Sequence, residues 1–119
     1  MNPPKISLGC VANLYSRQMY FEHAGDIEVG HTHPFDHLSL LAYGGVKCIV
    51  DGQESAFSAP CMIYIKKDKV HEFTALIDGT VVYCIHALRF GDKVEDIIDP
   101  DTIPKGVDPL SFAKPTVNT

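Results

Sequence analysis

The stretch that decides the fold is "GDIEVGHTHPFDHLSLLAYG", residues 25–44. It holds three of the six histidines in the chain, His31, His33 and His37. Side chains alternate along a β-strand, so His31 and His33 project from the same face of an extended chain. On a helix they would lie about 200° apart, and the proline that follows would disturb the helix. With a tight bend after His33 and a new strand at His37, we expect the three imidazoles to converge on one interior.

Converging imidazoles are a metal-binding arrangement, since neutral rings on a rigid sheet bind Zn, Fe, Mn, Ni or Cu. A single histidine is more often an ordinary surface or core residue, but three within seven residues favour a metal site. We expect a fourth ligand from a neighbouring strand. His71 opens the alternating run "HEFTA" and shares a face with Phe73 and Ala75. His23 is expected to be exposed, whereas His86 either lines the same interior or is a hydrogen-bonded core residue.

The rest of the chain has the texture of an all-β protein. Short runs rich in Val, Ile, Tyr, Phe and Thr are separated by Gly, Pro and Asp. So many short strands in 119 residues predict a single domain that is a sandwich or a small barrel. The predicted strands are 6–12, 18–23, 26–31, 37–43, 46–50, 53–57, 61–65, 70–76 and 80–88.

Two tight turns and an irregular tail complete this prediction. Asp51-Gly52 suits a hairpin turn with positive φ, and Asp78-Gly79 marks a second reversal. Residues 91–99 are the one segment with helical character, and Pro100 would end that helix. The segment 91–119 is rich in Pro and Asp and is expected to be an extended arm that wraps the domain, covers an opening or pairs with a second subunit.

Composition and charge exclude several classes of partner. Apolar residues make up 45% of the chain and charged residues 21%, as in soluble globular proteins. The net charge of −5, with no basic patch, argues against binding to nucleic acid or to acidic membrane surfaces. The N-terminus does not resemble a signal peptide, and no apolar stretch has the length of a membrane span.

The four cysteines are expected to be buried free thiols. Cys10, Cys48, Cys61 and Cys84 lie far apart, form no C-x-x-C pair and sit among apolar neighbours. A zinc finger is excluded because it needs paired cysteines. Free thiols are typical of a reducing compartment, so we expect a cytoplasmic protein.

The histidine pattern resembles the first motif of the cupin family. That motif runs Gly, five residues, His-x-His, three residues, Glu, six residues, Gly. Gly25, His31, His33 and Gly44 match at each of these spacings, and His37 stands in place of the Glu. In the second motif, which runs Gly, five residues, Pro-x-Gly, two residues, His, three residues, Asn, only His71 matches. The other motif positions are occupied by Pro60, Lys66, Asp68 and Ala75.

The resemblance implies a double-stranded β-helix, the jelly-roll barrel of cupins, in a single domain with its barrel core at about 18–90. It further implies one divalent transition metal per subunit (Fe, Mn, Ni, Cu or Zn), held by His31, His33, His37 and His71. This is the ligand set of the four-histidine group of small single-domain cupins. Four neutral ligands leave the site near +2, which favours an anionic or chelating small molecule.

Three functions are compatible with such a site. The first is a metal-dependent oxygenase or related oxidoreductase of the dioxygenase-like kind, and the second is a non-catalytic module that binds a small molecule or a metal. The third is a sugar isomerase or epimerase. Catalytic residues are not assigned, although Tyr43, Tyr64, Cys84 and His86 are candidates for the interior wall. Tyr43 has the same parity as His37, which predicts an inward or hydrogen-bonded core side chain.

A homodimer is expected from the strand at 37–43. Both of its faces are apolar, so one side needs to be covered by a second sheet or by a second subunit.

Overall fold

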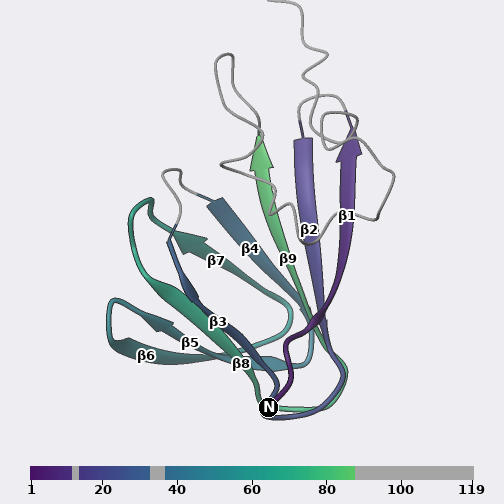
Figure 1. Ribbon diagram of the computed structural model, residues 1–119, viewed down its shortest axis with the longest axis vertical. Helices are drawn as coiled ribbons and strands as arrows, with labels where there is room; N and C mark the ends of the chain where they lie inside the picture. The colour runs from purple at the N-terminus through teal and green to yellow at the C-terminus, as the bar shows by residue number, and fades with distance from the viewer. Residues whose placement is uncertain (12–13, 33–36, 88–119) are drawn as a thin grey trace, which may run out of the picture.

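The computed structural model describes residues 1–11, 14–32 and 37–87. The part of the chain that it describes contains nine strands and no helix (Figure 1). The strands are β1 (Lys5–Val11), β2 (Leu14–Phe21), β3 (Ile27–His31), β4 (His37–Tyr43), β5 (Gly45–Val50), β6 (Gln53–Ser58), β7 (Cys61–Ile65), β8 (His71–Ala75) and β9 (Thr80–Ala87).

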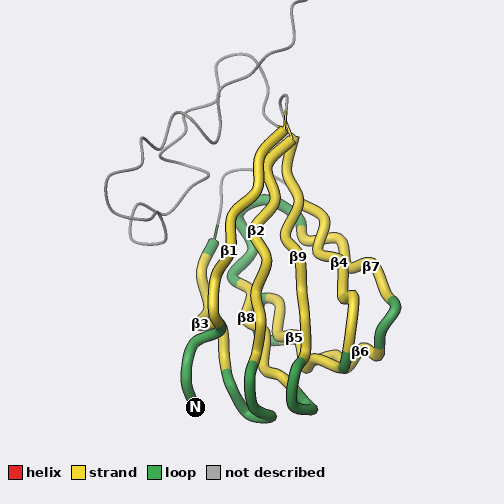
Figure 2. Tube along the Cα trace, turned by 90° about the vertical axis from the view of Figure 1, so that its right-hand side faces the viewer, coloured by secondary structure: helices red, strands yellow, loops and turns green. Residues whose placement is uncertain are grey.

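The strands form two antiparallel sheets that face each other. Sheet A has the order β1-β2-β9-β4-β7, and Figure 2 shows its strands side by side in front of the other sheet. Sheet B has the order β3-β8-β5-β6. Chain neighbours such as β3 and β4 lie in different sheets, so the chain crosses repeatedly between the two layers. The architecture is the all-β double-stranded β-helix that the sequence predicts.

All nine predicted strands are present, with shifts at their ends. The largest shift is in β2, which begins at Leu14 rather than at residue 18 because residues 14–20 pair with β1 and the whole strand pairs with β9. The predicted helix at 91–99 and the extended arm at 91–119 lie outside the described residues. Within the described residues there is no helix of the length and apolarity needed to cross a membrane.

Both predicted turns are confirmed. Asp51 and Gly52 have φ values of 48° and 81°, the left-handed pair that a two-residue hairpin between β5 and β6 needs. The Asp51 carboxylate also accepts a hydrogen bond from the Val70 amide at 3.1 Å and pairs with Lys69 Nζ at 3.0 Å. Gly79 has a φ of 77° in the reversal before β9.

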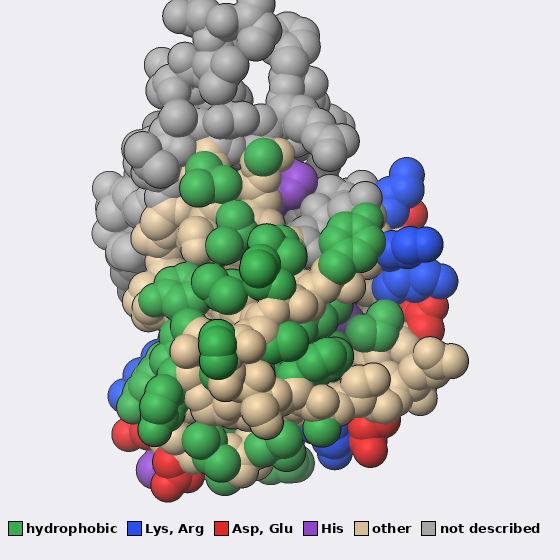
Figure 3. All heavy atoms as spheres, turned by 180° about the vertical axis from the view of Figure 1, so that it is seen from behind, with side chains coloured by type: hydrophobic (Ala, Val, Ile, Leu, Met, Phe, Trp, Pro, Cys, Tyr) green, Lys and Arg blue, Asp and Glu red, His purple; other side chains and the backbone are tan. Residues whose placement is uncertain are grey.

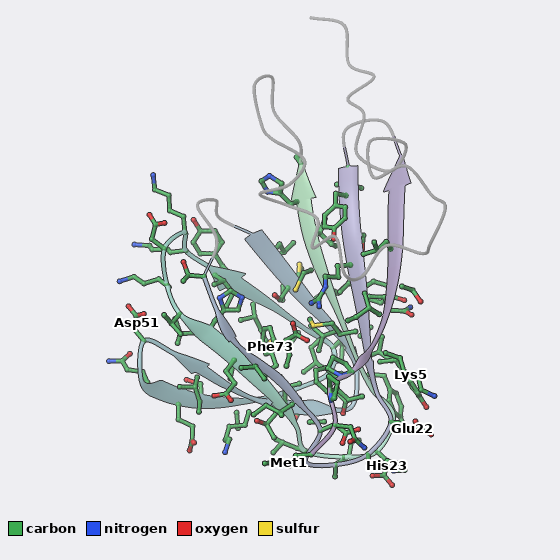
Figure 4. All side chains as sticks on the ribbon, in the orientation of Figure 1. Met1, Lys5, Glu22, His23, Asp51 and Phe73 are labelled. Atoms are coloured by element: carbon green, nitrogen blue, oxygen red, sulfur yellow. The ribbon has the colours of Figure 1, made fainter. Side chains whose placement is uncertain are left out.

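The space between the sheets is filled by side chains from both layers. Phe73 lies between them in Figure 4 and is almost completely buried. Three free thiols are present among the described side chains, with Cys48 buried and Cys61 and Cys84 partly buried. The buried apolar cluster comprises Met19, Phe21, Leu41, Val46, Cys48, Ile63, Ile65, Phe73, Ala75 and Val82.

Candidate metal centre

A bulge in β3 sets the register of His31. Ile27 pairs with Thr74 and Glu28 with Phe73, but the register shifts by one residue before His31, which pairs with His71. Because Phe73 and His71 both face the core, the bulge lets Glu28 and His31 occupy register positions opposite two interior residues. Without the extra residue, strict alternation would give these two positions opposite faces.

His71 lies where the sequence predicts, on the inner face of β8 with Phe73 and Ala75. Its side chain is 1% exposed, and its ring meets Phe73 edge-on with centroids 6.2 Å apart. Nδ1 lies 3.1 Å from the carbonyl oxygen of Lys69. A carbonyl oxygen only accepts, so Nδ1 carries the proton, and a neutral ring then has its lone pair on Nε2. In this tautomer the Nε2 lone pair can bind a metal ion.

The turn before His71 keeps its shape without the usual glycine. Asp68 has a φ of 61°, in the left-handed region that aspartate tolerates better than most residues. The chain therefore reaches β8 at His71 although the second motif is degenerate.

The other predicted ligands are partly outside the described part of the chain. His37 begins β4 opposite Ile65, whose side chain is buried. His33 lies outside the described residues, and the side chains of His31 and His37 are not described either. Among the described side chains no group of three metal-ligating residues occurs. The four-histidine set, of which only His71 is seen with its side chain, therefore stays a prediction.

His86 is buried near the end of β9. It pairs with Tyr15 of β2, which is also buried. Leu38 pairs with Ile85, so one further step of the same ladder sets the start of β4 beside His86. His86 is thus a buried residue next to the start of β4, and the two alternatives that the sequence leaves open for it remain predictions. His23 is exposed, as expected.

The structure contains an ion pair between the two sheets that the sequence analysis does not predict. Arg17 Nη2 of β2 lies 3.1 Å from Glu28 Oε1 of β3, and the two side chains are 17% and 14% exposed. Arg17 pairs with Cys84 and has the parity of the buried Tyr15 and Met19, so parity is the signal that points to it. The pair places a positive and a negative charge between the sheets, one inward-facing position further along β8 than His71.

Two thiols lie between the sheets at the same level along the strands as Arg17. Cys84 lies 3.5 Å from the Ser39 hydroxyl, and its burial raises the pKa of the thiol despite the nearby Arg17. Burial also raises the pKa of the Cys48 thiol to about 11, with a further contribution from Cys84. Both groups are therefore protonated at neutral pH, which makes them poor bases and poor nucleophiles.

The two tyrosines expected in the wall face the outside, and that prediction is wrong. The register of β4 shifts between Leu41 and Tyr43, so Tyr43 loses the parity it would share with His37 and is 59% exposed. Tyr64 pairs with Leu38 on the outer face of sheet A and is 60% exposed. Neither residue is a candidate for chemistry inside the barrel.

The known proteins that this chain resembles share its fold. No protein-family model and no curated protein sequence matches the chain. Among solved structures, KdgF from Halomonas sp. is similar with a TM-score of 0.63 at 17% identity, covering 73% of this chain and 80% of that chain. An uncharacterised protein with a double-stranded β-helix domain from Klebsiella pneumoniae has a TM-score of 0.63 at 16% identity, covering 71% and 76%. A cupin superfamily protein from Desulfitobacterium hafniense has a TM-score of 0.60 at 13% identity, covering 75% and 83%. The chain therefore has the double-stranded β-helix fold of the cupins.

Proposed function

We propose that this protein binds one divalent transition metal per subunit through His31, His33, His37 and His71. The observation that carries the proposal is the pairing of His31 with the buried His71, because cross-strand partners of an antiparallel pair share a face. The Nδ1 hydrogen bond of His71 supports it, since this tautomer has its lone pair on Nε2. The donor set is four imidazoles, which is compatible with Fe, Mn, Ni, Cu or Zn and does not select one of them.

We further propose that the partner of this site is a small anionic or chelating molecule. A bound divalent ion with neutral ligands supplies a site near +2 that attracts an anion. Within the described residues, Arg17 is the cation that faces the interior near this site, and its charge is balanced by Glu28. Its planar guanidinium suits a carboxylate, and Glu28 holds it in one orientation.

A catalytic role and a binding role require different side chains in the interior of the barrel. An oxygenase or other oxidoreductase needs groups that move protons near the metal. His86 is the remaining candidate for such a group. Tyr43 and Tyr64 lie outside the barrel, and the pKa of the Cys84 thiol is raised. This distribution favours the second candidate function, a non-catalytic module that holds a small molecule at the metal. A sugar isomerase has no specific support.

Elemental analysis of the freshly purified protein tests the metal site. We expect about one equivalent of a transition metal per chain, because four converging imidazoles make a high-affinity site. His33→Ala should lower the occupancy sharply while the circular dichroism spectrum of the barrel is kept. His23→Ala, at an exposed histidine, is the matched control and should keep full occupancy. A native chain that is isolated without metal and takes up none on dialysis would contradict the proposal.

Oxygen uptake separates the two candidate functions. The metal-loaded protein is offered diketones, catechols and thiols in turn, each of which can chelate or bind as an anion. Consumption of oxygen with any of them supports the oxidoreductase. Retention of a compound without turnover, measured by calorimetry, supports the binding module.

A further inference from the structure

The turn between β5 and β6 lies beside the segment that leads into β8 at His71. Val50, the last residue of β5, pairs with His71. One step further along the same ladder, the Asp51 amide donates to the Val70 carbonyl at 2.8 Å, and the Val70 amide donates to Asp51 Oδ1 at 3.1 Å. In a regular antiparallel pair the backbone carbonyl of residue 51 would accept this second bond. The carboxylate therefore continues the ladder one step beyond the end of β5.

The left-handed turn explains why a side chain has this role. Asp51 has a φ of 48° and, with Gly52, forms the two-residue connection to β6. The backbone leaves the ladder at this point, whereas a short side chain with an acceptor oxygen still reaches the neighbouring amide. Aspartate combines such an oxygen with tolerance of positive φ. Asparagine has both properties, and glycine has only the second.

The same carboxylate also contacts the residue before Val70. Asp51 Oδ2 lies 3.0 Å from Lys69 Nζ, and both side chains are about half exposed. Lys69 and Val70 lie between β7 and β8 and belong to neither strand. The carbonyl oxygen of Lys69 in turn accepts the hydrogen bond from His71 Nδ1 at 3.1 Å. A series of contacts thus runs from Asp51 through the backbone of residues 69–70 to the imidazole of His71.

We propose that Asp51 is a positioning residue for His71, an inference that rests on the proposed metal site. A histidine that binds a metal through Nε2 carries its proton on Nδ1, and the group that accepts this proton fixes the tautomer and the orientation of the ring. The accepting atom here is a backbone carbonyl in a segment between two strands. Its position therefore depends on what holds that segment, and Asp51 holds it from the adjacent turn.

The two contacts of the carboxylate differ in weight. The Asp51–Lys69 ion pair is half exposed, so solvent screens it and it contributes little. The hydrogen bond to the Val70 amide replaces a missing ladder bond next to His71, and an ionised acceptor strengthens it. We therefore assign most of the positioning effect to this hydrogen bond.

Asp51 acts from the surface of the molecule, so it can be changed without altering the core. Figure 4 places it at the edge of the molecule, away from the buried Phe73. Seen from behind, hydrophobic side chains cover much of the middle of the molecule, while charged ones gather toward its edges (Figure 3). Lys47 and Glu54 form another exposed ion pair in the same hairpin, at 3.6 Å. That pair joins β5 to β6 rather than to the segment before His71, and it supplies a matched control.

The tautomer of His71 in the metal-free, full-length protein gives a test that needs no metal. Imidazole ¹⁵N chemical shifts distinguish the two tautomers at about pH 8, where an ordinary histidine is neutral. The signal of His71 is the one that is lost in His71→Gln, and in the native chain it should be that of the Nδ1-protonated ring. Asp51→Gly keeps the turn but removes both contacts, so this signal should shift toward the Nε2-protonated form. Asp51→Asn keeps an oxygen for the Val70 amide and should retain the native tautomer.

Titration with Co²⁺ measures the consequence for the metal site. Asp51→Gly should bind Co²⁺ roughly tenfold more weakly than the native chain and with a changed visible absorption spectrum, because the ligand is less well oriented. Asp51→Asn should stay within about threefold of the native affinity, since a neutral acceptor replaces a charged one. Lys47→Met, which removes an ion pair of the same hairpin, should bind Co²⁺ as the native chain does.

Several results would overturn the inference. They are a native His71 protonated on Nε2, an Asp51→Gly variant with the native tautomer or the native Co²⁺ affinity, and an Asp51→Asn or Lys47→Met variant that loses as much affinity as Asp51→Gly. A native chain that binds no Co²⁺ would instead contradict the proposed metal site. The ¹⁵N measurement would then still decide whether Asp51 orients His71. Circular dichroism of each variant shows that the barrel is folded under the conditions used.

Discussion

Arg17 and Glu28 form the ion pair whose loss the barrel should tolerate least. Both side chains are mostly buried, so Arg17→Met leaves the Glu28 carboxylate between the sheets without its cation. We expect this variant to lose about 3 kcal/mol of unfolding free energy. The double variant Arg17→Met/Glu28→Leu should regain most of that loss, because no buried charge then remains uncompensated. Urea unfolding of both single variants and the double variant measures the coupling.

An exposed ion pair provides the control for this cycle. Lys5 and Glu22 lie 3.1 Å apart, but their side chains are 71% and 49% exposed. Lys5→Met should change the stability little, since solvent screens such pairs. Additive losses in the Arg17 and Glu28 variants would show that these residues do not act as a pair.

At the scale of elements, the connection between β4 and β5 depends on Gly44, the last residue of the histidine-containing motif. Gly44 has a φ of 87°, and a Cβ there would overlap Thr80 Oγ1 and lie 3.0 Å from Thr80 Cα. Thr80 cannot move easily, because it is fully buried and its hydroxyl donates to the Ile77 carbonyl at 2.9 Å. We expect Gly44→Ala to cost about 3 kcal/mol of unfolding free energy.

A second glycine separates the two causes of this loss. Gly52 has a φ of 81°, but a Cβ at this position would meet no atom within 4 Å, so Gly52→Ala introduces backbone strain alone. Its cost should be about 1 kcal/mol. Equal losses in the two variants, measured by urea unfolding, would show that contact with Thr80 is unimportant.

At the scale of the whole molecule, Asp26 links the N-terminus to the loop between β2 and β3, at the end of the molecule where Met1 and His23 lie in Figure 4. Its carboxylate accepts hydrogen bonds from the amides of Asn2 and His23, both at 3.1 Å. The Asn2 bond is the main reason that the pKa of Asp26 is lowered, and the His23 bond adds to it. A lowered pKa means that the ionised form stabilises the folded state at neutral pH. This stabilisation is lost as the pH falls from about 4 through the folded-state pKa.

Asp26→Asn should therefore be less stable than the native chain at pH 7, and the difference should shrink as the pH approaches about 3. Urea midpoints at several pH values measure this convergence. Asp68→Asn, at an exposed turn position where asparagine also tolerates the left-handed backbone, is the control. A gap between native and Asp26→Asn that stays constant with pH would assign the effect to packing rather than to charge.

The sequence by itself determined the strands and the turns of this protein, because these depend on local signals, and the resemblance of its histidine pattern to the cupin motif implied the fold. Alternating apolar residues, the Asp51-Gly52 pair and the inward face of His71 all follow from neighbours along the chain. The tertiary structure alone decided which residues meet between the sheets. The bulge in β3 gives His31 its place opposite His71, and the shift in β4 turns Tyr43 outward. Arg17 and Glu28 meet from different sheets. Strict alternation cannot predict these outcomes, because a bulge forms where pairing with another strand favours it, and that strand is distant in sequence.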